Sequence, residues 1–400
     1  MRTLYICYFG LREPLVQTQV LPYLRHLRAF GLDVSLLTFE PKQPSKLSAS
    51  DIQRVKLEAE GIRWLSLPYH KRPSVAATAY DILAGGRLAA RLVRKEGIDV
   101  LHARSHMPMA MALLASRLTR CKLIFDIRGL MAEEYADAGI WSEGSAPFRA
   151  VKRVERAGIR RAEQIVVLTE RLREWLVDHQ LKPAEQIEVI PCCVDFARFA
   201  EEGIERGEAS PAAGDGRFEV IYSGSLMGLY LVEEMGRFFQ AIKALRPDAF
   251  LRILSVSPPE HGIAALKRAG LDENDFAIKA VPPADVPSHL RRARLGLSFR
   301  KSTFAQIAAS PTKIPEYLAV GLPVVCNAGI GDMDKLVERE RIGVVLRDFD
   351  EATYRTSAAC ALALVEEAEV RARCMRAARA HFDLQTVGAQ RYINVYRRLG

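Results

Sequence analysis

Residues 310–325 read Ser310-Pro-Thr-Lys-Ile-Pro-Glu-Tyr-Leu-Ala-Val-Gly-Leu-Pro-Val-Val325, which is typical of a short helix followed directly by a buried strand. Pro315 is tolerated only in the first turn of a helix, so the helix should begin near Thr312, whose hydroxyl group could cap it. Gly321 can adopt the left-handed backbone that ends a helix, and Pro323 cannot continue one. The apolar run that follows predicts a strand over 324–326.

Lys313 lies at the start of this predicted helix, and Glu316 lies one turn further on. A helix N-terminus presents free N–H groups and the positive end of the dipole, which favour a bound phosphate group, and Lys313 adds a full positive charge. Glu316 could accept hydrogen bonds from sugar hydroxyl groups. In the alternative, Glu316 only complements the helix dipole and Lys313 is solvated. The spacing alone fits both interpretations.

This stretch resembles the donor-nucleotide motif of glycosyltransferase family 4, retaining enzymes of the GT-B fold, in the residues Lys313-Ile-Pro-Glu316-Tyr-Leu-Ala-Val-Gly321-Leu-Pro323-Val-Val. The resemblance implies that Glu316 binds the ribose of a sugar nucleotide. Many members carry a second glutamate close to the transferred sugar, at the position where this chain has Ala308. The motif therefore predicts a nucleotide contact and leaves recognition of the sugar to another residue.

Length and composition indicate a two-domain globular protein. A chain of 400 residues with 49% hydrophobic content can bury two cores. Residues 1–10 predict a strand rather than a signal peptide, and no apolar run approaches the ~20 residues that span a bilayer. Seven cysteines without a Cys-x-x-Cys pair indicate free thiols in a reducing compartment. We therefore expect a cytoplasmic protein.

The net charge of +9 is concentrated in clusters of lysine and arginine. The clusters lie at positions 87, 91, 94 and 95, at 149, 152, 153, 156, 160 and 161, and at 371, 373, 376 and 379. Such patches suit an anionic phospholipid surface or a phosphate-bearing substrate, so we expect peripheral contact with the inner face of the plasma membrane through a helix over 149–161. Nucleic acid is not an expected partner, because no recognition motif accompanies the charge. Solvated helix faces are the alternative.

Short apolar runs alternate with amphipathic stretches along the chain. The predicted strands cover residues 3–9, 34–39, 63–67, 100–103, 123–127, 164–168, 187–190, 218–222, 250–256, 276–281, 295–299, 324–326 and 343–346. This alternation predicts an α/β protein with parallel, doubly wound sheets. Together with the resemblance it implies the GT-B fold, in which two Rossmann-like domains face a central cleft.

An acidic, glycine-rich stretch without hydrophobic periodicity separates the two halves. It predicts an N-terminal, acceptor-binding domain over residues 1–200, a linker over 201–217, and a C-terminal domain over 218–384 that binds the sugar nucleotide. In the GT-B fold the last helix crosses back to the first domain, and residues 385–400 would do so here.

A glycine-rich turn, Tyr222-Ser-Gly-Ser-Leu-Met-Gly228, follows the first strand of the second half and could bring the backbone close to a phosphate group. Many family members hold the diphosphate with an Arg and Lys pair after this strand, which this chain lacks. Arg300 and Lys301, at the end of a later strand, are the predicted catalytic substitutes, and a plain surface strand end is the alternative. The residues predicted to bind the donor are Ser223, Gly224, Ser225, Ser310, Thr312, Lys313 and Glu316.

In the first half, Asp126 and Arg128 follow a predicted strand, at the end where parallel sheets bind ligands. Asp126-Ile-Arg-Gly129, His102-Ala-Arg-Ser105 and the stretch from Gly10 to Leu24 resemble a branch of family 4 that makes bacterial exopolysaccharides and capsules. We expect Asp126 and Arg128 to be catalytic. In the alternative, the two residues form a structural pair that braces the loop. The residues expected on the acceptor side are Gly10, Arg104 and Ser105.

The resemblance implies a retaining glycosyltransferase that moves a sugar from a UDP- or GDP-sugar to a lipid-linked saccharide acceptor in surface polysaccharide biosynthesis. Lys313, Arg300 and Lys301 would stabilise charge on the departing diphosphate, so we expect no cofactor and no metal ion. Asp332-Met-Asp334 has the Asp-x-Asp form of metal-dependent glycosyltransferases, but those enzymes have a different fold. Two alternatives stay open: a GT-B-fold epimerase of sugar nucleotides, and a non-catalytic partner subunit that binds them.

Overall fold

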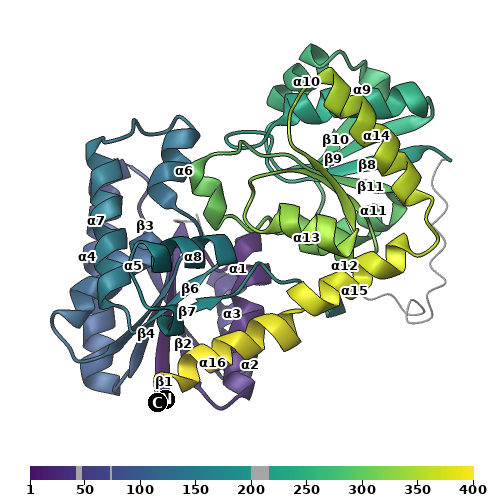
Figure 1. The fold of residues 1–400 in the computed structure, drawn as a ribbon. Coiled ribbons are helices and arrows are strands. Elements are labelled where there is room, and N and C mark those ends of the chain that lie inside the picture. The colour runs from purple at the N-terminus through teal and green to yellow at the C-terminus, as the bar shows by residue number, and fades with distance from the viewer. Residues whose placement is uncertain (42–46, 73, 200–215) are drawn as a thin grey trace. The chain divides into compact units, whose positions relative to one another are not determined.

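The computed structural model describes residues 1–41, 47–72, 74–199 and 216–400, which form two α/β units. Unit 1 consists of Met1–Pro191 and Leu384–Gly400, and unit 2 consists of Cys192–Asp383. Each unit is built on one parallel sheet with helices on both faces (Figure 1). The predicted fold class is therefore confirmed in its two parallel α/β sheets.

The sheet of unit 1 has the strand order β3-β2-β1-β4-β5-β6-β7. Its strands are β1 (Arg2–Cys7), β2 (Asp33–Pro41), β3 (Ile62–Tyr69), β4 (Val100–Arg104), β5 (Lys122–Asp126), β6 (Gln164–Val167) and β7 (Ile187–Val189). Its helices are α1 (Pro14–Gln19), α2 (Leu21–Ala29), α3 (Leu47–Ala59), α4 (Ser74–Glu96), α5 (His106–Ser116), α6 (Met131–Asp137), α7 (Ala146–Arg161), α8 (Glu170–Asp178) and α16 (Gln390–Arg397). Helices α4, α5 and α7 line one face of the sheet, and α2 and α16 line the other (Figure 1).

The sheet of unit 2 has the order β10-β9-β8-β11-β12-β13. Its strands are β8 (Phe218–Ser223), β9 (Ala249–Leu254), β10 (Phe276–Lys279), β11 (Leu295–Ser298), β12 (Val324–Asn327) and β13 (Gly343–Leu346). Its helices are α9 (Val232–Leu245), α10 (Pro259–Arg268), α11 (Val286–Arg292), α12 (Lys313–Ala319), α13 (Met333–Glu340), α14 (Glu351–Val365) and α15 (Val370–Phe382). Because all strands are parallel, the loops after β8, β11 and β12 emerge at the same edge.

Three local features could not be expected from hydrophobic periodicity alone. Residues 14–29 form two helices rather than one, and the backbone breaks at Val20, because Pro22 cannot donate a hydrogen bond inside a helix. Helix α5 has no polar face that would reveal a helical period, because most of it is buried. Residues 384–389 form a π-helical segment ahead of α16.

The division between the units falls between Pro191 and Cys192, earlier than the predicted boundary. Residues 192–199 therefore belong to unit 2, where Val194 N–H donates to the carbonyl oxygen of Phe382 at 2.8 Å. Most of the predicted linker over 201–217 lies outside the described residues.

Helix α12 is held against the sheet by Tyr317. The Tyr317 hydroxyl group accepts a hydrogen bond from Ser223 N–H at 2.8 Å, so α12 is joined to the end of β8. The ring fits because residue 296 of β11 is a glycine: a Cβ atom there would lie 2.4 Å from the Tyr317 ring. Gly321 has φ +76° and ends the helix as predicted. The seven-residue helix therefore starts beside the ends of β8 and β11.

Candidate functional site

The ammonium group of Lys313 is buried between two tyrosine rings at the start of α12. Its Nζ atom lies 4.8 Å from the centre of the Tyr222 ring and 4.4 Å from that of Tyr230. These distances are typical of cation–π contacts. Within the described residues, no carboxylate forms an ion pair with Lys313. The structure therefore holds a buried cation on two aromatic faces without a neutralising anion.

Arg300 brings a second positive charge to the same tyrosine. Its guanidinium carbon lies 5.1 Å from the centre of the Tyr230 ring. Asn327 fixes the backbone of Arg300, because its side chain accepts from Arg300 N–H at 2.8 Å and donates to the carbonyl oxygen at 3.0 Å. The Nε atom of Arg300 is buried and has no hydrogen-bond partner among the described residues. The side chains of Lys313 and Arg300 thus both contact the ring of Tyr230.

The pKa of Lys313 falls from 10.5 to about 7, chiefly because burial disfavours the charged form and further because Arg300 repels it. Glu316 opposes the shift but does not cancel it. An anion placed beside Lys313 and Arg300 would restore the charged lysine and relieve the repulsion between the two cations.

Gly224 makes room for the lysine. Its φ of +149° lies in a region that favours glycine, and a Cβ atom at this position would lie 3.0 Å from Lys313 Nζ. The predicted glycine-rich turn after β8 therefore approaches Lys313 closely, and glycine is required there for two separate reasons.

Glu316 lies one turn further along α12 and is half-buried. Burial raises the pKa of its carboxyl group from 4.5 to about 6, against the influence of Arg198 and Lys313. No described residue donates a hydrogen bond to this carboxylate, so its acceptor capacity is available to a ligand. Arg198 lies in the 192–199 segment, and sequence reasoning did not single it out.

The other predicted donor residues are placed less directly. Ser310 Oγ accepts a hydrogen bond from Cys192 N–H at 3.0 Å, and Ser225 Oγ accepts one from Met227 N–H at 3.2 Å. Thr312 precedes α12 but its side chain does not cap it, which contradicts the expected cap. Lys301 is exposed, in contrast to the half-buried Arg300. Burial thus singles out Arg300 and Lys313 as a pair.

In unit 1, Asp126 is fully buried and surrounded by donors. Arg104 and Arg128 lie 3.5 and 3.4 Å from its carboxylate oxygens, and Tyr392 of α16 donates to it at 2.8 Å. Burial alone would raise the pKa of Asp126, but Arg128, His102 and Arg104 outweigh it and hold the pKa well below its usual value. The contacts favour the structural interpretation of the Asp126–Arg128 pair, in which the carboxylate anchors α16.

The residues predicted on the acceptor side lie at the same edge of this sheet. Arg104 is buried within the Asp126 cluster. Ser105 has a positive φ of 71°, and its N–H donates to the carbonyl oxygen of Asp126 at 2.8 Å. Gly10 is buried, and a Cβ atom there would lie 3.1 Å from Glu40. The backbone of these residues is therefore closely packed.

Residues 16–193 match the family model described as Glycosyl transferase 4-like domain. No curated protein matches the sequence. Sucrose-phosphate synthase from Thermosynechococcus elongatus superimposes with a TM-score of 0.72 at 16% identity, over 100% of this chain and 99% of that chain. A glycosyltransferase from Rickettsia africae gives 0.69 at 13%, over 100% and 98%. HepE from Anabaena in complex with UDP-glucose gives 0.68 at 14%, over 99% and 100%.

The chain has the GT-B fold. The family model covers less than half of the chain, and the structural neighbours, at 13–16% identity, show the fold. In this GT-B chain, the buried cations and Glu316 all lie in unit 2.

One buried side chain in unit 2 was missed by sequence reasoning. Gln306 lies in the short 3-10 helix Phe304–Ala308, is fully buried, and has no hydrogen-bond partner for either amide atom among the described residues. Its backbone carbonyl oxygen accepts from Gly331 N–H at 2.8 Å, which joins this turn to the loop after β12. A buried amide without hydrogen-bond partners lowers the stability of the folded protein. The signal in the sequence that could have identified Gln306 is its proximity to Ala308.

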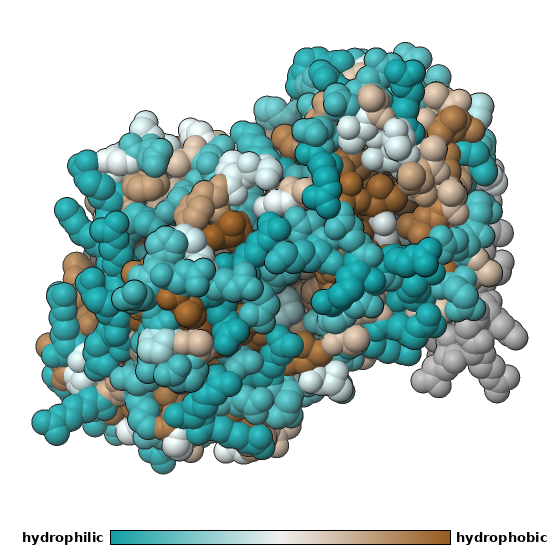
Figure 2. Space-filling model, in the orientation of Figure 1, coloured by the Kyte–Doolittle hydropathy of each residue, from teal (hydrophilic) through white to brown (hydrophobic). Residues whose placement is uncertain are grey.

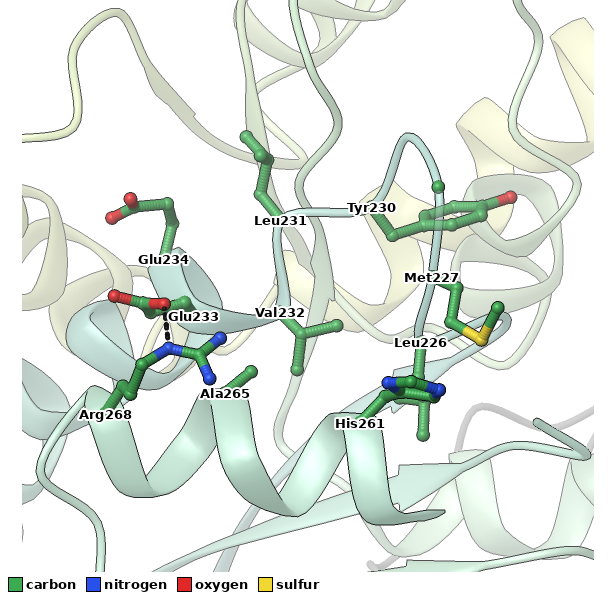
Figure 3. A pocket seen from close by; sticks show the side chains of 11 residues that line it. Leu226, Met227, Tyr230, Leu231, Val232, Glu233, Glu234, His261, Ala265 and Arg268 are labelled. Atoms are coloured by element: carbon green, nitrogen blue, oxygen red, sulfur yellow. Dashed lines mark hydrogen bonds and ion pairs between the residues drawn. The ribbon is translucent and has the colours of Figure 1, made fainter. Parts of the chain in front are cut away.

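A pocket of about 470 Å³ opens beside Tyr230, between the loop after β8 and helix α10 (Figure 3). Glu233 and Arg268 form an ion pair at one end at 2.9 Å, and His261 lies toward the other end (Figure 3). The carboxylate of Glu233 is thus paired with Arg268, and Glu234 adds a further negative charge to the lining, whereas Lys313 and Arg300 have no carboxylate partner among the described residues. The positive charges that would bind an anionic ligand therefore lie at Lys313 and Arg300, beside Tyr230.

The Asp-x-Asp segment has a structural use. Asp334 is buried, and its carboxylate accepts hydrogen bonds from Gly329 N–H at 3.1 Å and from Lys335 N–H at 2.8 Å. Among the described residues, no group of three or more His, Cys, Asp or Glu side chains is arranged to hold a metal ion. The carboxylate of Asp334 braces the loop between β12 and α13.

Proposed function

We propose that this protein is a retaining glycosyltransferase that transfers a sugar from a UDP- or GDP-sugar to a saccharide acceptor. One observation carries the proposal: Lys313 and Arg300 share the Tyr230 ring, and no carboxylate of the described residues pairs with either of them. A diphosphate would supply the missing negative charge. Because the two cations are fixed before the donor arrives, they are suited to stabilise charge that develops on the leaving group.

Glu316 would bind the ribose of the donor. Its carboxylate is half-buried and free of protein donors, and hydroxyl groups would satisfy it. HepE, a structural neighbour, was solved with UDP-glucose, which supports a nucleotide sugar as the donor class. Lys313 and Arg300 would stabilise the negative charge of the diphosphate, as a metal ion does in other enzymes. The proposal therefore includes transfer without a metal ion.

Gln306 would contact the transferred sugar in place of the glutamate that Ala308 lacks. Its amide could donate to one hydroxyl group and accept from another. Replacing Gln306 with Met, which is similar in size and apolar, should stabilise the empty protein by removing unpaired polar atoms. The same change should weaken binding of UDP-glucose about tenfold and leave binding of UDP unchanged. Equal affinity of the variant and the wild type for UDP-glucose would contradict this role.

In the proposed transfer, the bond between the anomeric carbon and the diphosphate breaks while the acceptor oxygen bonds on the same face of the sugar. The acceptor proton passes to the departing phosphate oxygen, so no protein nucleophile is needed. The acceptor is proposed to be a lipid-linked saccharide of a surface polysaccharide.

A basic surface on unit 1 would bring the enzyme to that lipid. Helices α4 and α7 both pack against α5, and their exposed positions carry many basic residues, interspersed with hydrophobic ones (Figure 2). The exposed basic residues are Arg87, Arg91, Arg94, Lys95, Arg149, Arg153, Arg156, Arg160 and Arg161. No helix in the described residues is long and apolar enough to cross a membrane. Peripheral binding to anionic lipid at the cytoplasmic membrane face is therefore the proposal.

Proton NMR of slow donor hydrolysis tests the proposal. When the protein is incubated with UDP-glucose or GDP-mannose, the first sugar released should keep the anomeric configuration of the donor. Inversion would contradict a retaining mechanism. A sugar nucleotide isomerised without hydrolysis would identify an epimerase, and tight binding without any turnover would identify a non-catalytic subunit.

A further inference from the structure

His70 and Asp81 form a hydrogen-bonded pair in unit 1 that lies outside the residues discussed so far. His70 Nδ1 lies 2.6 Å from Asp81 Oδ1, and Asp81 Oδ2 accepts from Tyr8 at 2.7 Å and from His70 N–H at 3.1 Å. The Asp81 side chain is 1% exposed, whereas that of His70 is 31% exposed. The carboxylate is thus a buried support for an imidazole that reaches the surface.

The pairing fixes the protons of the ring. A carboxylate only accepts hydrogen bonds, so Nδ1 of His70 must carry a hydrogen atom, and in the neutral imidazole Nε2 is then an acceptor. No described residue bonds to Nε2. If the pair served only to join β3 to α4, the contacts at Nδ1 and at the backbone would be enough. Nε2 is left for a hydrogen-bond donor from outside the protein.

An exposed aromatic ring lies beside the imidazole, and two further tyrosines lie close in sequence or contact. Tyr80 is 60% exposed and meets the His70 ring edge-on at 5.2 Å. Tyr69 precedes His70 and packs on Tyr8 at 5.4 Å. Exposed aromatic faces beside a hydrogen-bonding group suit a sugar ring, which has apolar C–H faces and a rim of hydroxyl groups.

The position in the sheet agrees with ligand binding. Tyr8 follows β1 and His70 follows β3, so both lie at the carboxyl edge of the parallel sheet. Loops at this edge are where such sheets bind ligands. Asp126, the last residue of β5, lies at the same edge.

We propose that unit 1 carries a saccharide subsite in which His70 Nε2 accepts a hydrogen bond from a hydroxyl group of the acceptor, beside the ring of Tyr80. Asp81 is a positioning residue that holds the imidazole in the required tautomer. The inference rests on the proposed transfer to a saccharide, but the subsite can be tested without a donor.

The test uses the full chain with octyl β-glucoside, octyl β-galactoside and octyl α-mannoside below their micellar concentrations. Saturation-transfer NMR measures glycoside binding, and long-range proton–nitrogen spectra follow the His70 ring. His70→Asn is the informative variant, because its amide nitrogen can still donate to Asp81 while Nε2 is lost. His179→Asn, at an exposed histidine of the same unit, is the control.

We expect His70 to carry its hydrogen atom on Nδ1 and at least one glycoside to shift the Nε2 resonance. Glycoside affinity should fall about five- to tenfold in His70→Asn and stay unchanged in His179→Asn. UDP-glucose affinity, measured on the same samples, should be equal in all three proteins. The proposal is overturned if no glycoside shifts Nε2, or if His70→Asn binds glycosides as well as the wild type. Failure of UDP-glucose to bind the wild type would instead count against the donor site.

Discussion

Burial between two tyrosine rings lowers the pKa of Lys313. Between pH 7 and 10.5 the folded protein binds fewer protons at this residue than the unfolded chain does. The contribution of Lys313 to the free energy of unfolding therefore increases as pH rises through that window, and at pH 7 the charged form is the destabilised one. A bound diphosphate would reverse this preference.

Donor binding should consequently take up a proton. At pH 8, where free Lys313 is largely neutral, binding of UDP-glucose should take up close to one proton per site. Isothermal titration calorimetry in buffers of different ionisation enthalpy measures this uptake. Lys335→Met, at an exposed lysine of α13, should behave as the wild type. Binding without proton uptake would show that the donor does not approach Lys313.

Glu316 should lower the stability of the empty protein and raise its affinity for UDP. Its pKa of about 6 means that the ionised carboxylate is disfavoured in the folded protein, so Glu316→Gln should stabilise the empty protein at pH 7 by about 1–2 kcal/mol. The same change should weaken UDP binding about tenfold, because a hydrogen bond to a charged group is lost. Thermal unfolding and calorimetry measure the two effects. A less stable variant with unchanged UDP affinity would indicate a purely structural role.

Among the secondary-structure elements, the helix and strand over 310–325 could be predicted because proline and glycine mark where they begin and end. Pro315 and Gly321 each restrict the backbone to one place in a helix. The carboxyl-edge rule likewise identified Arg300. Tyr230 could not be predicted, because its importance depends on side-chain direction and burial, and for Gln306 the sequence offers only its proximity to Ala308. Asp126 shows the converse: its sequence position suggested catalysis, and its contacts with Tyr392 and two arginines favour a structural role.

The turn after β8 should tolerate no Cβ atom at Gly224. Gly224→Ala would combine an unfavourable positive φ with a contact 3.0 Å from Lys313 Nζ, so UDP affinity should fall at least tenfold. Gly216→Ala is the matched control, because φ is +82° there and no atom of the described residues lies within 4 Å of the added methyl group. The control should lose stability without losing UDP affinity. Equal losses of affinity in both variants would remove the argument for contact with Lys313.

At the scale of the whole chain, charge reversal should separate membrane binding from donor binding. Arg153→Glu, Arg156→Glu and Arg160→Glu together change the exposed face of α7. Flotation with vesicles of 30% anionic lipid should fall about tenfold or more, since each basic residue near the surface contributes about 1 kcal/mol. UDP affinity should not change. A control that reverses Lys267, Lys335 and Arg347 in unit 2 alters net charge equally, and equal flotation of both triple variants would contradict a specific surface on α7.

Thermal unfolding with UDP-glucose and GDP-mannose shows directly whether Lys313 and Arg300 form the diphosphate site. We predict that at least one of these donors raises the melting temperature of the wild type and of Lys335→Met. Neither donor should raise that of Lys313→Met or Arg300→Met, although both variants remain folded. A diphosphate site at these two residues is contradicted if neither donor stabilises the wild type, or if the Lys313 and Arg300 variants are stabilised as strongly as the wild type.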